Sequence, residues 1–243
     1  MRTLSGWLFL FVNIVSVLTV FAASDENLIP ALSDSVFEVF FVNSLSGNSI
    51  LFNLSMGIIV SSLFYFIVVY LPEKQKKNDI LPQIDQHVSE IIAKTWILVS
   101  ETVNHSGKGF EIERLKEDEF LEACKAVNPC NLFHKFHNGG AGIYQLHFGY
   151  VCSNNWDHVL RNINEVMHFL PYVDTGVVKI LNKIRSASLG QTIGMLKDID
   201  KLNNTDMSSW SSCIFNVYKL SIELEIYYVK YINKKFGHPY KKT

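Results

Sequence analysis

One long apolar run constrains this chain more than any other feature. Residues 50–71 read ILFNLSMGIIVSSLFYFIVVYL, contain no charged residue and stop at Pro72. A bilayer core about 30 Å thick takes about 20 apolar residues of helix to cross. Lys74, Lys76 and Lys77 follow at once, and basic residues beside a span mark its cytoplasmic side. The sequence therefore predicts an integral membrane protein, with a spanning helix at about 50–71 and everything after Leu71 on the cytoplasmic side.

A second apolar run lies at the amino terminus. It covers Leu4–Ala23, directly behind Arg2, and it exceeds the roughly 7–15 residues usual for the core of a cleavable signal. This length favours a retained transmembrane helix. The small residues of Val20–Ala23 would also suit a signal peptidase, so a cleaved signal is the alternative. Both alternatives leave the carboxyl-terminal part in the cytoplasm.

The connecting segment 24–49 differs in charge from both of its flanks. It contains four acidic residues and no lysine or arginine. The positive-inside rule then predicts a multi-pass protein with a transmembrane hairpin over 1–72, helices at about 4–23 and 50–71, and both termini in the cytoplasm. Within the segment, Val36–Val42 is strongly apolar and predicts a short interfacial helix or an extension of a membrane helix.

Polar and small residues lie inside the two apolar runs. An amide in hydrocarbon is costly without a partner, and a hydrogen bond between membrane helices contributes about 1 kcal/mol. Small residues at four-residue spacing let two helices approach closely. We therefore expect helix–helix association, within the hairpin or between copies of the chain, and a polar stripe lining a pore is the remaining alternative. The residues concerned are Asn13, Asn53, Gly57, Ser61 and Ser62.

Residues 73–243 have the composition of a soluble domain and read as mostly helical. Apolar residues recur every three or four positions, as in helices that each bury one stripe and pack as a bundle. The predicted fold class is a membrane-anchored all-α protein, with a two-helix transmembrane hairpin followed by a cytoplasmic helical bundle. Residues 143–152 fit a short strand or a buried helix. Three helices are expected at 80–104, 110–127 and 207–236. Another is expected to begin at Asn154 or Asn155 and to end at Pro171. A further helix is expected to begin at Asp174 and to be interrupted at Gly190.

Cysteines and histidines gather in one stretch of the predicted cytoplasmic domain. Cys124, Cys130, His134 and His137 are residue types that bind zinc, and Cys130 and His134 would share one face of a helix. Their spacing lacks the close C-x2-C pair that identifies zinc sites. We interpret the cysteines as buried, reduced thiols, with a metal site as the alternative, and we expect no cofactor.

Two charged stretches of the predicted bundle suggest contacts with other molecules. The acidic run 111–122 is typical of a solvated helix face, with a docking surface for a basic partner as the alternative. Aromatic residues lie among Lys230, Lys234 and Lys235. This pattern fits the end of a soluble helix. The alternatives are contact with an anionic membrane surface, together with the lysines after Pro72, and contact with nucleic acid. A net charge of −1 excludes a protein that is basic overall and binds nucleic acid by bulk charge.

The order of these parts resembles the small two-transmembrane effectors that accompany bacterial anti-phage systems, such as some retron-associated toxins. The resemblance rests on Leu4–Ala23, Ile50–Leu71, the lysines that follow and the compact helical domain behind them. It implies an antiviral defence toxin that is held silent through its cytoplasmic domain and damages the inner membrane when it is released.

We therefore expect a membrane-anchored effector or sensor. No catalytic arrangement is recognisable in the sequence, so we do not expect an enzyme. The expected partners are membrane lipid, a protein bound through the cytoplasmic domain and further copies of the chain, with nucleic acid entering only through a partner complex. The alternatives are a non-toxic membrane-tethered scaffold and a membrane-bound metalloenzyme that uses the cysteine–histidine stretch.

Overall fold

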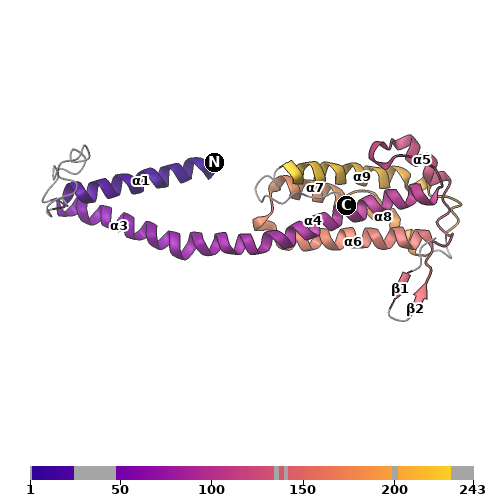
Figure 1. Ribbon diagram of the computed structural model, residues 1–243, viewed down its shortest axis with the longest axis horizontal. Coiled ribbons are helices and arrows are strands. Elements are labelled where there is room, and N and C mark those ends of the chain that lie inside the picture. Colours follow the sequence, from indigo (N-terminus) through magenta and orange to yellow (C-terminus); the bar gives the residue numbers. More distant parts are fainter. Residues whose placement is uncertain (1, 25–47, 134–136, 140–141, 199–201, 231–243) are drawn as a thin grey trace. The chain divides into compact units, whose positions relative to one another are not determined.

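The computed structural model divides the chain into two compact units, Met1–Asn78 and Asp79–Thr243, each with its own internal packing (Figure 1). Helices dominate both units. The structure describes residues 2–24, 48–133, 137–139, 142–198 and 202–230.

The described part of the first unit contains two apolar helices, α1 (Arg2–Ala23) and α3 (Ser49–Tyr65), which pack against each other. The side-chain oxygen of Asn48 accepts a hydrogen bond from the Leu51 amide at 3.1 Å and so caps the first turn of α3. The predicted interfacial segment Val36–Val42 lies outside the described residues.

The helix that starts at Ser49 continues past Pro72, so the apolar run 50–71 and the predicted helix 80–104 lie in one continuous helical stretch. A π-helical segment, η1 (Phe66–Tyr70), and then α4 (Leu71–His105) follow α3 without a break. Proline has no N–H, and its ring crowds the carbonyl four residues earlier in a regular α-helix. The wider π turn, in which the Leu71 amide donates to the Phe66 carbonyl, gives the Pro72 ring room.

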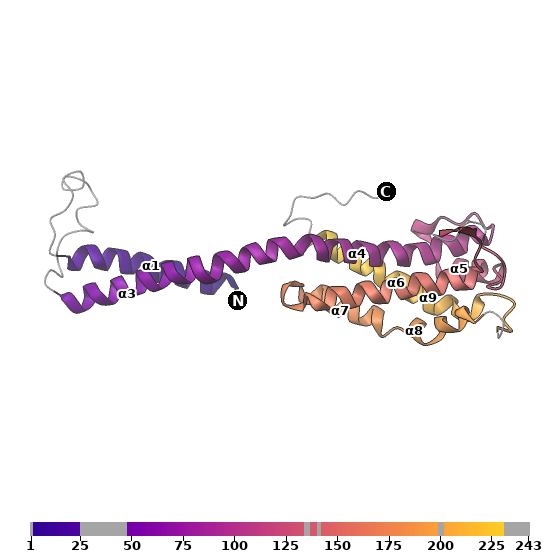
Figure 2. The same ribbon diagram turned by 90° about the horizontal axis from the view of Figure 1, so that it is seen from below.

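The second unit is a bundle of helices, as the spacing of apolar residues predicted. Figures 1 and 2 show α4, α6, α7 and α9 running alongside one another. The predicted helix 80–104 is confirmed as part of α4. Besides α4, the described elements of this unit are η2 (Ile112–Arg114), α5 (Glu117–Lys125), α6 (Phe148–His168), η3 (Leu170–Tyr172), α7 (Thr175–Arg185), α8 (Leu189–Thr192), η4 (Ile193–Lys197) and α9 (Ser208–Tyr228).

Aromatic side chains form much of the bundle core. Phe120 of α5 stacks on Phe215 of α9 with ring centroids 5.8 Å apart. Phe148 at the start of α6 stacks on the ring of His105 at the end of α4, at 4.7 Å. Burying one such ring contributes about 1.5–3 kcal/mol. These contacts connect elements that lie far apart in the sequence.

A short β-hairpin precedes α6. Its strands are β1 (His137–Gly139) and β2 (Gly142–Tyr144), antiparallel, with residue 137 opposite residue 144. Leu132 and His147 form an isolated antiparallel bridge beside it. The stretch 143–152, which the sequence left open, is therefore strand at its beginning and helix at its end. The fold is mainly helical, as predicted, and the two three-residue strands of this hairpin are a small addition to it.

Local signals located some helix ends and missed others. Asp174 caps α7 as predicted, because its side chain accepts a hydrogen bond from the Gly176 amide at 2.8 Å. Asn154 and Asn155 are not caps, since they lie inside α6. That helix starts at Phe148 because burial of its first turns in the core extends it beyond the local capping signal.

Three other boundaries also differ from the sequence prediction. The region 110–127 forms the short η2 and α5 in place of one helix. The break expected at Gly190 falls at 186–188, and Gly190 itself lies within α8, facing the Trp156 indole ring. α9 begins at Ser208, and the predicted end of this helix lies outside the described residues.

Candidate functional site

Large apolar side chains cover the outside of α1 and α3. The exposed fraction is 73 % for Trp7, 63 % for Phe11 and 64 % for Phe64. In the most apolar 18-residue stretch of each helix, the buried share is 11 % for α1 and 6 % for the helix that starts at Ser49. A core helix of a soluble protein would be mostly buried. The described residues therefore include two helices that are long and apolar enough to cross a membrane.

The contact between α1 and α3 is made by small residues. Among the described side chains of this unit, the buried ones are Ser16 and Ala23 of α1 and Ser55 of α3. Small side chains let two helix backbones approach closely, which favours packing where lipid supplies no hydrophobic driving force. Phe9 and Tyr65 add a ring contact, with centroids 6.1 Å apart. The sequence analysis missed Ser16 and Ser55, although their type is the signal that it used elsewhere.

Asn13, one of the predicted association residues, has a partner within its own helix. Its Nδ2 atom donates a hydrogen bond to the Phe9 carbonyl at 2.8 Å. The Thr19 hydroxyl donates in the same way to the Val15 carbonyl at 2.8 Å. Such bonds to the preceding turn satisfy a polar donor inside hydrocarbon without a second helix.

The other four predicted association residues line one open groove in the first unit. Asn53, Gly57, Ser61 and Ser62 of α3 lie there together, opposite Phe9 of α1. The groove has a volume of about 490 Å³, and Leu54, Ile58 and Tyr65 complete its wall.

This groove is not filled by α1. A Cβ atom added at Gly57 would meet no atom within 4 Å. Among the described residues, the Asn53 side chain makes no hydrogen bond. Gly57 and Asn53 therefore do not hold α3 against α1, and they remain available on the surface of α3.

The lysines after the apolar run lie on the first turns of α4. Lys74 and Lys76 are exposed and Lys77 is half-buried. The Lys74 ammonium lies 6.0 Å from the centre of the Tyr70 ring, a cation–π distance. Lys230 is exposed just after α9. Lys234 and Lys235 lie outside the described residues.

The structure separates the cysteines of the predicted metal stretch. Cys124 is fully buried on α5, and burial, aided by the charge of Asp206, raises the pKa of its thiol to about 12. Cys130 lies half-buried in a turn. The side chains of His134 and His137 lie outside the part that the structure describes, and within that part no three histidine, cysteine or carboxylate side chains converge.

A neutral, buried thiol is a poor metal ligand, because zinc binds the thiolate. Burial also raises the pKa of the nearby Cys152 thiol, and the charges of Cys124 and Glu101 add to that rise. Both side chains belong to the hydrophobic core. Their environment therefore favours an inert structural role over coordination.

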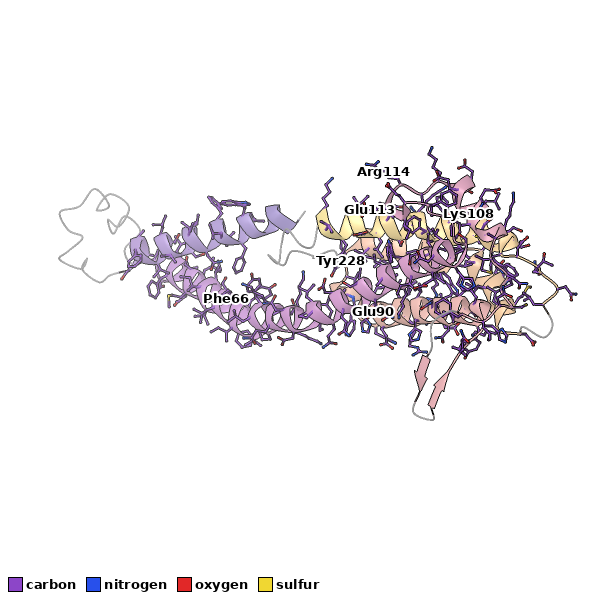
Figure 3. All side chains as sticks on the ribbon, turned by 45° about the vertical axis from the view of Figure 1, so that its right-hand side comes forward. Phe66, Glu90, Lys108, Glu113, Arg114 and Tyr228 are labelled. Atoms are coloured by element: carbon purple, nitrogen blue, oxygen red, sulfur yellow. The ribbon has the colours of Figure 1, made fainter. Side chains whose placement is uncertain are left out.

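The acidic run 111–122 is used within the fold. Its residues in the first turn of α5 lie where carboxylates offset the helix dipole. The Glu119 side chain accepts a hydrogen bond from the Lys116 amide at 2.9 Å, and Glu117 pairs with Lys219 of α9 at 2.8 Å. Figure 3 shows this edge of the unit, where Glu113 and Arg114 are labelled.

Two tyrosines, whose hydrogen bonds the sequence did not predict, hold the end of α9. The Tyr228 hydroxyl donates a hydrogen bond to Asp85 of α4. The Tyr227 hydroxyl donates to Asp174, the cap of α7, at 2.5 Å. Asp174 carried a detectable capping signal, but its pairing with a residue more than fifty positions away could not be inferred from local patterns.

No protein-family model, characterised protein or solved structure matches the chain.

Proposed function

We propose that this chain is a membrane-anchored effector or sensor whose helices α1 and α3 cross a bacterial inner membrane as a hairpin. The observation that carries this proposal is the exposed apolar surface of the first unit. More than twenty large apolar side chains between Trp7 and Leu71 are exposed. Each contributes about 1.5–3 kcal/mol when it leaves water, so a lipid environment stabilises these helices strongly.

Charge supports the orientation of the hairpin. Arg2 and the lysines at 74, 76 and 77 flank the apolar runs, whereas segment 24–49 carries acidic residues alone. Basic residues near the ends of a span are retained in the cytoplasm. In this arrangement both termini and the helical bundle lie in the cytoplasm.

The open groove on α3 supports an action within the membrane. Asn53 has no side-chain partner among the described residues, and Gly57 and Ser61 leave space beside it. In hydrocarbon, an unpaired amide gains about 1 kcal/mol from a hydrogen bond to another helix. Association of hairpins from several copies through this face would perturb the bilayer once the cytoplasmic bundle receives its signal. Antiviral defence is the setting that we propose for such an effector.

Depolarisation of cells tests the membrane action. We expect induced expression of the full chain, or of the chain with its trigger, to depolarise the inner membrane, as measured with a potential-sensitive dye. Asn53→Leu should weaken the effect, because it removes the unpaired amide. Asn13→Leu is the matched control, since the Asn13 amide is already bonded to Phe9. Equal responses of the two variants, or no depolarisation by the wild-type chain, would contradict the proposal.

Replacement of the anchor separates an effector from a scaffold. We expect that exchanging residues 1–72 for an unrelated two-helix anchor will abolish depolarisation and any protective effect, because the groove is lost. A scaffold would need the anchor only for location and would keep its effect after the exchange. Retained function with the foreign anchor would therefore identify the chain as a tethered interaction module.

A further inference from the structure

The end of α9 is attached to two other helices of the bundle by adjacent side chains. Tyr227 and Tyr228 are neighbours, so on a helix they point in directions about 100° apart. The hydroxyl of Tyr228 donates to Asp85 of α4, and that of Tyr227 donates to Asp174 at the start of α7, at 2.5 Å. One helical turn thus binds two helices through charged acceptors, which form stronger hydrogen bonds than neutral ones.

The contact with Asp85 lies where α4 enters the bundle. Buried residues of α4 begin at Ile84, next to Asp85, and Val88 follows one turn later. Pro82 lies just before them and lacks the N–H of a regular helical bond. Tyr228 is only 3 % exposed, whereas Asp85 is exposed, so the tyrosine end of this bond is buried and the carboxylate end faces water. The α9 contact therefore holds α4 within one turn of its internal proline.

The contact with Asp174 has a steric requirement. The Asp174 side chain accepts hydrogen bonds from both the Gly176 amide, at 2.8 Å, and the Tyr227 hydroxyl. A Cβ atom added at Gly176 would lie 2.1 Å from the Tyr227 ring. Only glycine at this position lets the ring lie over the first turn of α7.

We propose that Tyr227 and Tyr228 form a clamp. Opening of this turn of α9 is the conformational step that frees residues 80–90 of α4, the first part of that helix within the bundle. The clamp joins α4, α7 and α9 at one place, so its two hydrogen bonds open together. Because α4 leads directly into η1 and α3, release of its first turns is a route by which a signal at the bundle reaches the apolar helices. In that last respect alone the inference rests on the proposed function.

Hydrogen–deuterium exchange of the full chain in lipid nanodiscs tests the clamp. Tyr228→Phe should speed exchange in peptides covering 80–90 by about tenfold or more, the effect of losing a hydrogen bond to a charged group. Peptides covering 95–105 should keep the wild-type rate. Tyr150→Phe is the matched control, since Tyr150 is half-exposed on α6 and has no side-chain hydrogen bond within the described residues.

A second variant tests whether the two contacts open together. Gly176→Ala touches neither Tyr228 nor Asp85, yet it displaces the Tyr227 ring and should also speed exchange over 80–90. Gly194→Ala is its control, because a Cβ atom there meets nothing within 4 Å. Wild-type exchange over 80–90 in both clamp variants, or a uniform rise over the whole bundle, would overturn the proposal. Should Tyr228→Phe fail to fold, Gly176→Ala decides alone.

Depolarisation measured on the same variants keeps the two proposals apart. Faster exchange over 80–90 together with stronger depolarisation supports both. Faster exchange without any depolarisation by the wild-type chain or the variants supports the clamp and contradicts the membrane action. Unchanged exchange contradicts the clamp, whatever the dye reports.

Discussion

Replacing two residues on the outer face of α3 by lysine should move the carboxyl-terminal bundle to the other side of the membrane. Val60 and Phe64 lie one turn apart, with 61 % and 64 % of their surface exposed and away from the small-residue contact with α1. The apolar run 50–71 contains fourteen leucine, isoleucine, valine and phenylalanine residues. At about 0.3–0.6 kcal/mol each, they favour insertion by about 4–8 kcal/mol before the polar residues are subtracted.

Each lysine at the centre of a span opposes insertion by about 2.5–3.5 kcal/mol. Val60→Lys with Phe64→Lys therefore cancels the whole insertion energy of α3, and one substitution alone does not. With α1 as the remaining span, the bundle would then be carried across the membrane. An alkaline phosphatase fused at Thr243 should be inactive on the wild-type chain and active on the double variant.

Matched variants make this result specific to α3. Val60→Leu with Phe64→Leu keeps the span apolar and should leave the fused phosphatase inactive. Ile226→Lys changes an exposed apolar residue of the bundle, 63 % accessible on α9, and should also leave it inactive. An active phosphatase on the wild-type chain, or an inactive one on the double lysine variant, would refute the hairpin and its orientation.

Three further outcomes are expected for the bundle. Metal analysis of the purified chain should find no stoichiometric zinc or iron, because the Cys124 thiol is buried and neutral; a bound equivalent would favour the metalloenzyme alternative. The melting temperature should fall as the pH rises from about 9 towards 12. The pKa of the Cys124 thiol is about 12 in the folded protein and 9.0 ordinarily, so unfolding releases a proton between these pH values. A melting temperature that does not change over this range would contradict the buried thiol. Phe120→Ala should lower the free energy of unfolding by about 3–5 kcal/mol in chemical denaturation, since it empties a fully buried site and removes the ring contact with Phe215; a loss below 1 kcal/mol would contradict that packing.

Signals that act over a few residues predicted the helical parts of this chain well. The uncharged run 50–71 and the spacing of apolar residues over 80–104 depend only on neighbours along a helix, and both lie in helices of the structure. Asp174 was identified as a cap because a cap bonds to amides two or three residues away.

Signals that compete with distant packing were misleading. Asn154 and Asn155 are good caps in isolation, yet burial of the preceding turns extends α6 to Phe148. The capping preference, about 1 kcal/mol, was outweighed by burial of those turns, which adjacent residues do not reveal.

The sequence by itself determined that the chain has two membrane-length apolar helices and a helical bundle, because hydrophobic period and length are local properties of a helix. Only the tertiary structure decided which polar residues have partners on other helices: Asn53 remains open in a groove, Tyr227 bonds to Asp174, and Tyr228 bonds to Asp85. Those pairings depend on which helix faces meet, and the packing of the whole core sets that.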